Sequence, residues 1–381
     1  MWLVDRRGGT RKDYTNNKER VVKNHYKGKK MKERNMSIQM LRGVLCLIIF
    51  AFHCDIPYAD FGWWGVETFF VISSFFLVKK YWGNEMIHVK EQFFHRIIRL
   101  YPPYIPVVLA AALYAFLREA VPFDFAAHLF SLQNILWMAT GYSSPMQPMT
   151  AHTWTLVIEV WIGLLWLFLL KALNKEQFKR SMYTALFFSI AYRTITIGIG
   201  CNARIVSLFP LAHMDAFACG SILAISVYEK RIDKRKLGMA ALAGLTGIII
   251  CILKMAEVNN VSFIQGYELL SSSKNYLNHW FTGNIYLFLS LASSALIGVL
   301  YLHDTKTDVI KNRFVKMLIY IGNDSYALYL FHWPILVVAK RVISIKLMLL
   351  LIVFAISWLT VWGFNRGMSL IQNKLSKVEV K

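Results

Sequence analysis

Long apolar stretches recur along the whole chain, and each is long enough to cross a bilayer as a helix, which takes about 20 residues. Hydrophobic residues make up 56% of the 381 residues and charged residues 17%, which leaves too little polar surface for a soluble domain. The sequence therefore predicts an all-α, polytopic membrane protein with about ten transmembrane helices in one bundle. The predicted spans are residues 38–57, 64–80, 100–117, 153–171, 181–199, 205–228, 236–254, 282–303, 315–338 and 345–365.

Basic residues flank these spans unevenly, and their distribution predicts the orientation. Residues 1–35 hold twelve Lys and Arg against four acidic residues, without periodicity, and are predicted to be a disordered segment. Basic clusters also follow the second, fourth, sixth and eighth spans. The positive-inside rule makes these loops cytoplasmic, so we expect a multi-pass protein of the plasma (inner) membrane with both termini inside. Residues 36–367 form the predicted transmembrane domain, and 368–381 a short cytoplasmic tail.

The net charge of +21 also raises the possibility of a nucleic-acid partner. The charges flank apolar helices, however, and do not form a basic face with interleaved aromatic residues. We therefore expect the lipid bilayer as a partner and no nucleic acid. The cysteine and histidine spacing matches no metal-binding pattern, so no metal is expected, and no small-residue stripe indicates an oligomeric state.

Four ionisable residues inside the spans point to chemistry: His53, Glu67, Glu159 and His332. Groups of this kind are costly in a membrane and usually mark a functional path, although each could also be a packed or solvated side chain. All four are expected at a similar depth near the outer surface, around a polar cavity. There a neutral imidazole could accept a proton from a hydroxyl, with Glu67 or Glu159 orienting the ring of His53.

Three arginines are expected at the opposite, cytoplasmic surface. Arg96 and Arg99 are three residues apart and share a helix face, which suits a phosphate clamp with Arg42, although basic anchoring residues would look the same. Pro102 and Pro103 follow directly and are expected to break or open the helix just inside the membrane.

Six short segments in a fixed order resemble the membrane acyltransferase-3 family, whose members are integral membrane O-acyltransferases. The segments are Arg42 to His53 with its R-x10-H spacing, GVETFFVIS at 65–73, RIIRLYPPY at 96–104, Trp154-Thr155-Leu156 with Glu159, Asp215 to Gly220, and GNDSYALYLFHWP at 322–334. One departure is Ser74, where family members commonly have glycine.

The resemblance implies transfer of an acyl group, with acetyl favoured, from cytoplasmic acyl-CoA to a hydroxyl of an extracytoplasmic or lipid-linked carbohydrate. It implies that Arg42, Arg96 and Arg99 hold the CoA phosphates. His53 would act as a general base or as a transient acyl carrier, with Glu67 and Glu159 as its catalytic partners. The residues expected to contact the acceptor are Trp154, Ser325, Tyr326, Tyr329 and His332.

Two points stay open in the sequence, the class of activity and the identity of the substrates. A proton-coupled transporter or flippase-like protein for a glycan or lipid is the main alternative, and a non-catalytic binding relative is another. The acceptor and the acyl group are not specified by the sequence. We expect no hydrolase-like periplasmic domain of the kind that some family members carry after the bundle.

Overall fold

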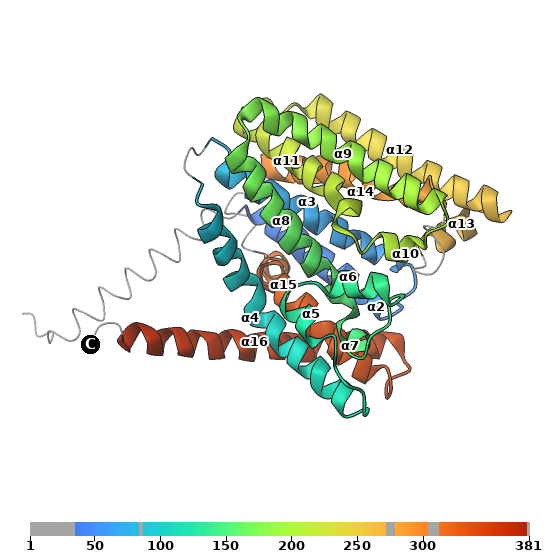
Figure 1. The fold of residues 1–381 in the computed structure, drawn as a ribbon. Helices are drawn as coiled ribbons and strands as arrows, with labels where there is room; N and C mark the ends of the chain where they lie inside the picture. The colour runs from blue at the N-terminus through green and yellow to red at the C-terminus, as the bar shows by residue number, and fades with distance from the viewer. Residues whose placement is uncertain (1–34, 84–86, 272–278, 304–311, 379–381) are drawn as a thin grey trace, which may run out of the picture.

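The structure, a computed structural model, describes residues 35–83, 87–271, 279–303 and 312–378, and within these ranges it is all-α (Figure 1). The predicted disordered segment 1–35 lies outside the described residues except for Asn35, whose side chain accepts a hydrogen bond from the backbone of Ile38 and caps the first helix. The long helices are α2 (Met36–His53), α3 (Trp64–Tyr81), α4 (Val89–Phe116), α8 (Trp154–Ala172), α9 (Lys175–Gly198), α11 (Met214–Tyr228), α12 (Lys234–Asn259), α14 (Ile285–Leu302), α15 (Arg313–Ala339) and α16 (Lys346–Val378). The short ones are α5 (Phe125–Leu129), α6 (Gln133–Ala139), α7 (Gln147–Thr150), α10 (Ala203–Val206) and α13 (Phe263–Ser271), together with four 3-10 turns (Asp60–Trp63, Ala151–Thr153, Pro210–His213 and Thr282–Asn284).

The prediction of a polytopic helical membrane protein is confirmed. Eight segments among the described residues are long and apolar enough to span a bilayer. The helices α9 and α15, of 24 and 27 residues, are also long enough but more polar. Counting both gives ten candidate spans, the number predicted from the sequence. Leucine and phenylalanine side chains are exposed on the outside of several helices, as expected of a lipid-facing surface. Examples are Leu109, Leu113, Phe187, Leu245 and Leu351.

Several predicted boundaries were wrong. The helix expected at 100–117 begins at Val89 and passes through Pro102 and Pro103 without a break, because a transmembrane helix tolerates proline where other groups satisfy the freed carbonyls. The span expected at 205–228 is divided, with α10 separate from the turn and helix that run from Pro210 to Tyr228. The last helix continues to Val378, so most of the predicted tail is helical.

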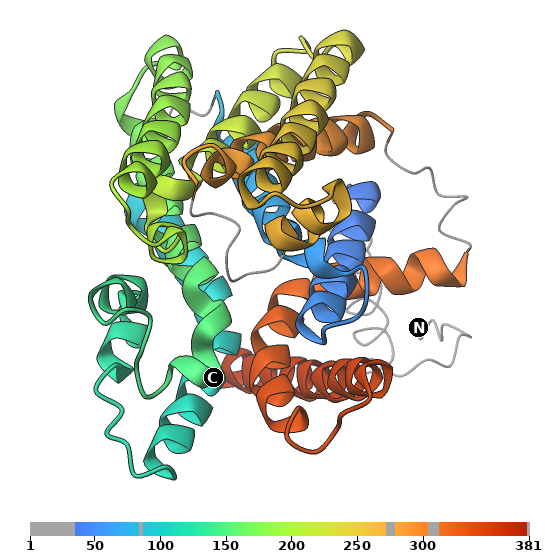
Figure 2. The same ribbon diagram turned by 90° about the vertical axis from the view of Figure 1, so that its right-hand side faces the viewer.

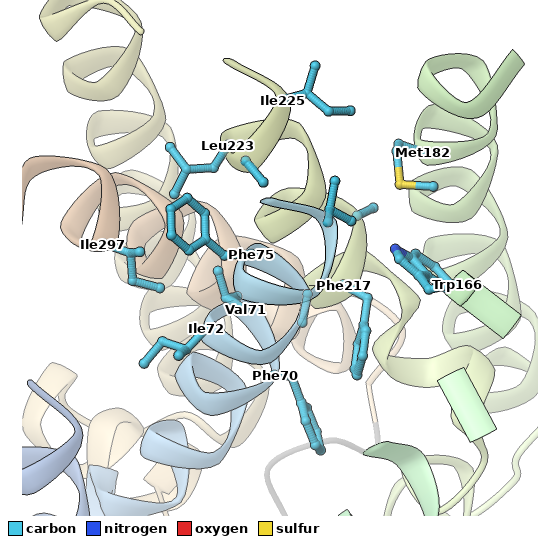
Figure 3. Packing of buried hydrophobic residues seen from close by; sticks show 14 of the residues in the cluster. Phe70, Val71, Ile72, Phe75, Trp166, Met182, Phe217, Leu223, Ile225 and Ile297 are labelled. Atoms are coloured by element: carbon cyan, nitrogen blue, oxygen red, sulfur yellow. The ribbon is translucent and has the colours of Figure 1, made fainter. Parts of the chain in front are cut away.

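Three closely packed helix pairs organise the bundle: α2 with α15, α3 with α11, and α12 with α14. Figures 1 and 2 show α16 lying along the side of the molecule near α15, while α9 and α12 lie at the far edge. The main apolar cluster lies around α3, whose Phe70 and Phe75 pack among side chains of α8, α9, α11 and α14 such as Trp166 and Phe217 (Figure 3). This cluster fixes α3, which borders the site described below.

The two ends of the bundle differ in chemistry. At one end, called the basic end here, α2 begins and α14 ends, with the side chain of Asn35 donating to the carbonyl of Tyr301 at 3.4 Å. At the other, called the histidine end, α2 ends at His53 and α15 ends near Lys340, which bonds Asp55 at 2.7 Å. The short helices α5, α6 and α7 lie between the end of α4 and the start of α8 at the histidine end (Figure 1).

Two glycines let α2 and α15 touch backbone to backbone. A Cβ at Gly322 would lie 1.9 Å from the carbonyl oxygen of Gln39, and one at Gly43 would lie 2.1 Å from that of Leu318. No side chain can be accommodated at such distances without separating the helices. The pairing of α2 with α15 therefore depends on these glycines.

We expect Gly322→Ala to destabilise the protein by at least about 1–3 kcal/mol, because the added methyl group would meet rigid backbone. Gly363→Ala in α16 is the matched control, since nothing lies within 4 Å of a Cβ there. The measurement is the thermal unfolding midpoint of each purified variant in the same detergent. A Gly322→Ala midpoint equal to that of Gly363→Ala would contradict the packing.

Candidate active site

A cavity of about 820 Å³ lies inside the bundle, lined by side chains of α2, α3, α4, α8, α15 and α16. Its lining at the basic end includes Lys80, Gln92 and Asn365, and it reaches Thr155 and Tyr329 near the histidine end. Ligand-sized cavities lined by apolar side chains with a few polar groups are typical binding sites. The cavity therefore contains all three predicted arginines, and of the four residues predicted near the outer surface it contains Glu159.

Arg96 is held firmly in the wall of this cavity. Its Nη2 donates at 3.1 Å to the carboxylate of Glu159, and at the same distance to the hydroxyl of Ser73 and to the backbone carbonyl of Glu159. The hydroxyl of Ser73 in turn donates to Glu159 at 2.9 Å. A Cβ at Gly163 would lie 2.7 Å from Arg96 Nε, so the missing side chain makes room for the guanidinium. Arg96 is thus a fixed, charge-compensated group.

Arg99 and Arg42 also line the cavity but are placed differently. The Arg99 side chain is 69% exposed, and its Nη2 lies 4.0 Å from Glu159, against 7% exposure for the Arg96 side chain. Arg42 donates to the hydroxyl of Ser325 at 3.1 Å. Arg99 is therefore the arginine best able to turn toward an entering anion, because its side chain is not locked by burial.

The prolines of α4 add polar backbone to the same wall. Proline has no N–H, so Pro102 and Pro103 cannot donate to the carbonyls of Ile98 and Arg99 four residues earlier. All four residues line the cavity. The sequence predicted that freed backbone groups would line something polar here. The structure places these four residues at the cavity wall, and the helix does not break.

A pair of histidines lies next to the cavity, on the side toward the histidine end of the bundle. Nδ1 of His53 is 2.8 Å from Nε2 of His332, and Nδ1 of His332 is bonded to the carbonyl of Tyr329. His332 is fully buried, whereas His53 is half-buried. The hydroxyl of Tyr329, which lines the cavity, donates at 2.8 Å to the carbonyl of a third histidine, His152. The pair is thus one residue away from the cavity wall.

The expected contact of His53 with Glu67 or Glu159 is wrong. Glu67 faces α11 and α14, where its carboxylate lies 3.0 Å from His213 Nδ1 and accepts from Ser290 at 3.2 Å. Glu159 faces α4 and binds Arg96. Each carboxylate binds a residue other than His53, so the four predicted residues form three separate clusters.

Glu67 and His213 are part of a buried charged network with Arg193 and Asp215. The Arg193 guanidinium bonds the Asp215 carboxylate at 2.6 Å, and the four side chains are at most 2% exposed. No member lines the cavity. These contacts join α3 to the turn that precedes α11, and α9 to α11, and they satisfy polar groups inside the bundle.

The residues expected to bind the acceptor also lie in different parts of the bundle. Tyr326 and Tyr329 line the cavity, and Tyr326 donates to the carbonyl of Leu100 at 2.9 Å. Ser325 lies beside Arg42 toward the basic end. Trp154 does not line the cavity and packs on His213, with ring centroids 5.4 Å apart.

The sequence prediction did not include His152. Pro334 does indicate that a carbonyl in this helix needs a hydrogen-bond donor from another segment. Pro334 leaves the carbonyl of Leu330 without its helical donor, and His152 Nε2 supplies a hydrogen bond to that oxygen at 3.0 Å. A carbonyl freed inside a membrane requires a donor from a neighbouring segment. Sequence alone does not say which segment that is.

Comparison with known proteins identifies the family of the chain. Residues 35–364 match the acyltransferase-3 family, described as an acyltransferase domain. The chain belongs to the acyltransferase-3 family. The matched range covers α2 through most of α16 and includes every residue of the cavity wall named above except Asn365, as well as the histidine pair.

Curated relatives of this acyltransferase-3 chain carry the name O-acetyltransferase. OatA of Staphylococcus aureus (strain NCTC 8325 / PS 47) is 23% identical over 319 residues, which cover 78% of this chain and 50% of OatA. The peptidoglycan O-acetyltransferase OatA of Listeria monocytogenes serovar 1/2a (strain ATCC BAA-679 / EGD-e) is 22% identical over 340 residues, covering 81% and 50%. The chain thus spans about half the length of these relatives. No solved structure matches it.

We expect Glu67→Ala to lower stability by about 1–3 kcal/mol, because it leaves His213 Nδ1 and the hydroxyl of Ser290 buried without the carboxylate that they contact. The control is Glu257→Ala, which removes a carboxylate whose side chain is 67% exposed and paired with Lys254. The measurement is the thermal unfolding midpoint in detergent. If Glu67→Ala kept the midpoint of Glu257→Ala, the network would not have the structural role given to it here.

Proposed function

We propose that the protein is a membrane O-acyltransferase that moves an acyl group, acetyl in the first instance, from acyl-CoA to a hydroxyl of a carbohydrate acceptor. One observation carries the proposal: one cavity is lined by three arginines and reaches Tyr329, whose backbone carbonyl bonds the histidine pair. Along α2 the arginine and histidine levels, eleven residues apart, are separated by about 16 Å. Family membership and the O-acetyltransferase relatives support this activity.

The arginines would hold the phosphates of the donor at the basic end. Guanidinium groups bind phosphates through paired, charge-assisted hydrogen bonds. Arg99 and Arg42 provide the first contacts, and Arg96 contributes a fixed positive charge already balanced by Glu159. The thioester end of the donor would then extend along the cavity past Tyr326 toward Tyr329.

His53 would act where the thioester meets the acceptor. As a general base it takes the proton of the acceptor hydroxyl while the oxygen attacks the thioester carbonyl. As an acyl carrier it would first form an acyl-imidazole itself. Both routes use a ring nitrogen of His53, next to the cavity wall, and both release CoA as the thiol.

The basic end would face the cytoplasm, where acyl-CoA is found, and both termini would lie on that side. The distribution of Lys and Arg supports this orientation. The acceptor would then approach from the histidine end, outside the inner membrane, as a free or lipid-linked carbohydrate. Peptidoglycan is the first acceptor to test, because a relative bears that name.

We expect His53→Ala to abolish acylation, a loss of at least about 100-fold, because the acceptor hydroxyl then has no base. The measurement is mass spectrometry of ester-linked acyl groups on surface glycans from cells lacking the protein and complemented with each variant at equal membrane levels. His303→Ala is the control, since that side chain is exposed near the basic end.

Two outcomes would contradict the proposal. Full acylation with His53→Ala would remove this residue from the mechanism. Unchanged acylation in cells lacking the protein, with an altered amount or location of a glycan, would instead indicate a transporter.

Arg99→Ala should mainly weaken use of the donor, raising the KM for acyl-CoA about tenfold with kcat changed less than about twofold, because a phosphate contact far from the reacting atoms is lost. The assay is transfer from labelled acetyl-CoA in proteoliposomes. Arg180→Ala removes an exposed charge in α9, a helix that contributes nothing to the cavity wall, and is the matched control. Equal KM values for the two variants would exclude Arg99 from donor binding.

A further inference from the structure

The hydrogen bonds of His332 determine which of its ring nitrogens carries a proton. Its Nδ1 is bonded to the backbone carbonyl of Tyr329, an oxygen that can only accept. Nδ1 therefore carries the hydrogen, and in the neutral ring Nε2 is left as an acceptor. The carbonyl belongs to the helix that carries His332 itself, so α15 sets this state without help from a ligand.

The same logic extends to His53. The two rings meet through His53 Nδ1 and His332 Nε2 at 2.8 Å. Since His332 Nε2 accepts, His53 Nδ1 must donate, and the remaining nitrogen of the neutral His53 ring, Nε2, carries the lone pair. The rings are stacked with an interplanar angle of 20° and centroids 5.0 Å apart, which holds His53 in one orientation.

We infer that His332 is the positioning residue of His53, and that the chain Tyr329 carbonyl, His332, His53 makes His53 Nε2 the reactive nitrogen. The inference deepens the proposed function and rests on it. A neutral imidazole would take the place that a carboxylate holds in the serine hydrolase triad. Glu67 and Glu159 do not compete for this role, because they are bonded to His213 and Arg96.

The step that this arrangement supports balances without a further reactant. The O–H bond of the acceptor breaks and its proton goes to His53 Nε2, while the oxygen forms a bond to the thioester carbonyl carbon. The C–S bond then breaks, and the leaving sulfur takes the proton from Nε2 to give CoA thiol and neutral His53. Throughout, the Nδ1–H of His53 stays bonded to His332, which stabilises the imidazolium that forms between the two transfers.

Burial explains why a histidine can hold this position. His332 is fully buried against Phe50, with ring centroids 4.7 Å apart. A carboxylate there would be an added charge inside the membrane and would need a partner of its own. A neutral ring with both nitrogens bonded needs none.

Two substitutions of His332 separate hydrogen bonding from shape. His332→Phe keeps a planar ring beside Phe50 but cannot accept from His53, and His332→Gln offers an amide oxygen that can. We expect His332→Phe to lower kcat at least about 100-fold with the KM for acetyl-CoA within about twofold, and His332→Gln to retain kcat within about tenfold. Both are assayed in proteoliposomes beside wild type and His53→Ala, with thermal midpoints recorded.

A second measurement does not depend on the His332 variants folding. The ring ¹⁵N chemical shifts of histidine-labelled wild-type protein, with His53→Ala to assign the signals, report which nitrogen is protonated. The inference predicts a proton on Nδ1 and none on Nε2 of His53 at neutral pH. A proton on Nε2 alone would overturn it.

The outcomes distinguish this inference from the proposed function. Equal kcat values for His332→Phe and His332→Gln would overturn the inference, because accepting a hydrogen bond from His53 would then make no difference to catalysis. Active His332→Phe with inactive His53→Ala would also overturn it but leave the proposed function standing. Transfer by His53→Ala at the wild-type rate would contradict the mechanism proposed for His53 itself.

Discussion

Backbone contact between α2 and α15 is the constraint on which the site depends. Gly43 and Gly322 allow the two helices to touch, since a Cβ at either would lie within about 2 Å of a carbonyl oxygen. With the helices held at this separation, Arg42 reaches Ser325 toward one end and His53 reaches His332 at the other. Both contacts therefore depend on the close packing of α2 against α15.

The ionisable groups inside the bundle are arranged so that charges meet opposite charges. Within the described residues, Arg96 is paired with Glu159, and Arg193 with Asp215. An unpaired charge in such surroundings would be costly, and losing one member of a buried pair destabilises strongly. The histidine pair solves the problem differently, because two neutral rings satisfy each other through one proton. That difference separates groups that hold the bundle together from a group that can take part in proton transfer.

Proline has a consistent use in this fold. In α4, Pro102 and Pro103 free carbonyls along the cavity wall without ending the helix, and in α15 Pro334 frees a carbonyl that His152 then binds. Each proline thus creates a polar position within an apolar helix. In one case the position faces the cavity and in the other it ties the start of α8 to the helix of the histidine pair.

The sequence by itself determined the helical membrane fold, because spans of about 20 apolar residues have few other solutions. It also singled out His53 as an ionisable residue that is costly inside a membrane, and three arginines as a candidate phosphate clamp. Tertiary structure decided the partners. The sequence offered Glu67 and Glu159 as partners of His53 and assigned His332 to the acceptor pocket, because spacing within one helix does not fix which face meets which other helix. The close α2 and α15 contact selected His332, and the side on which each glutamate lies directed it to His213 or Arg96.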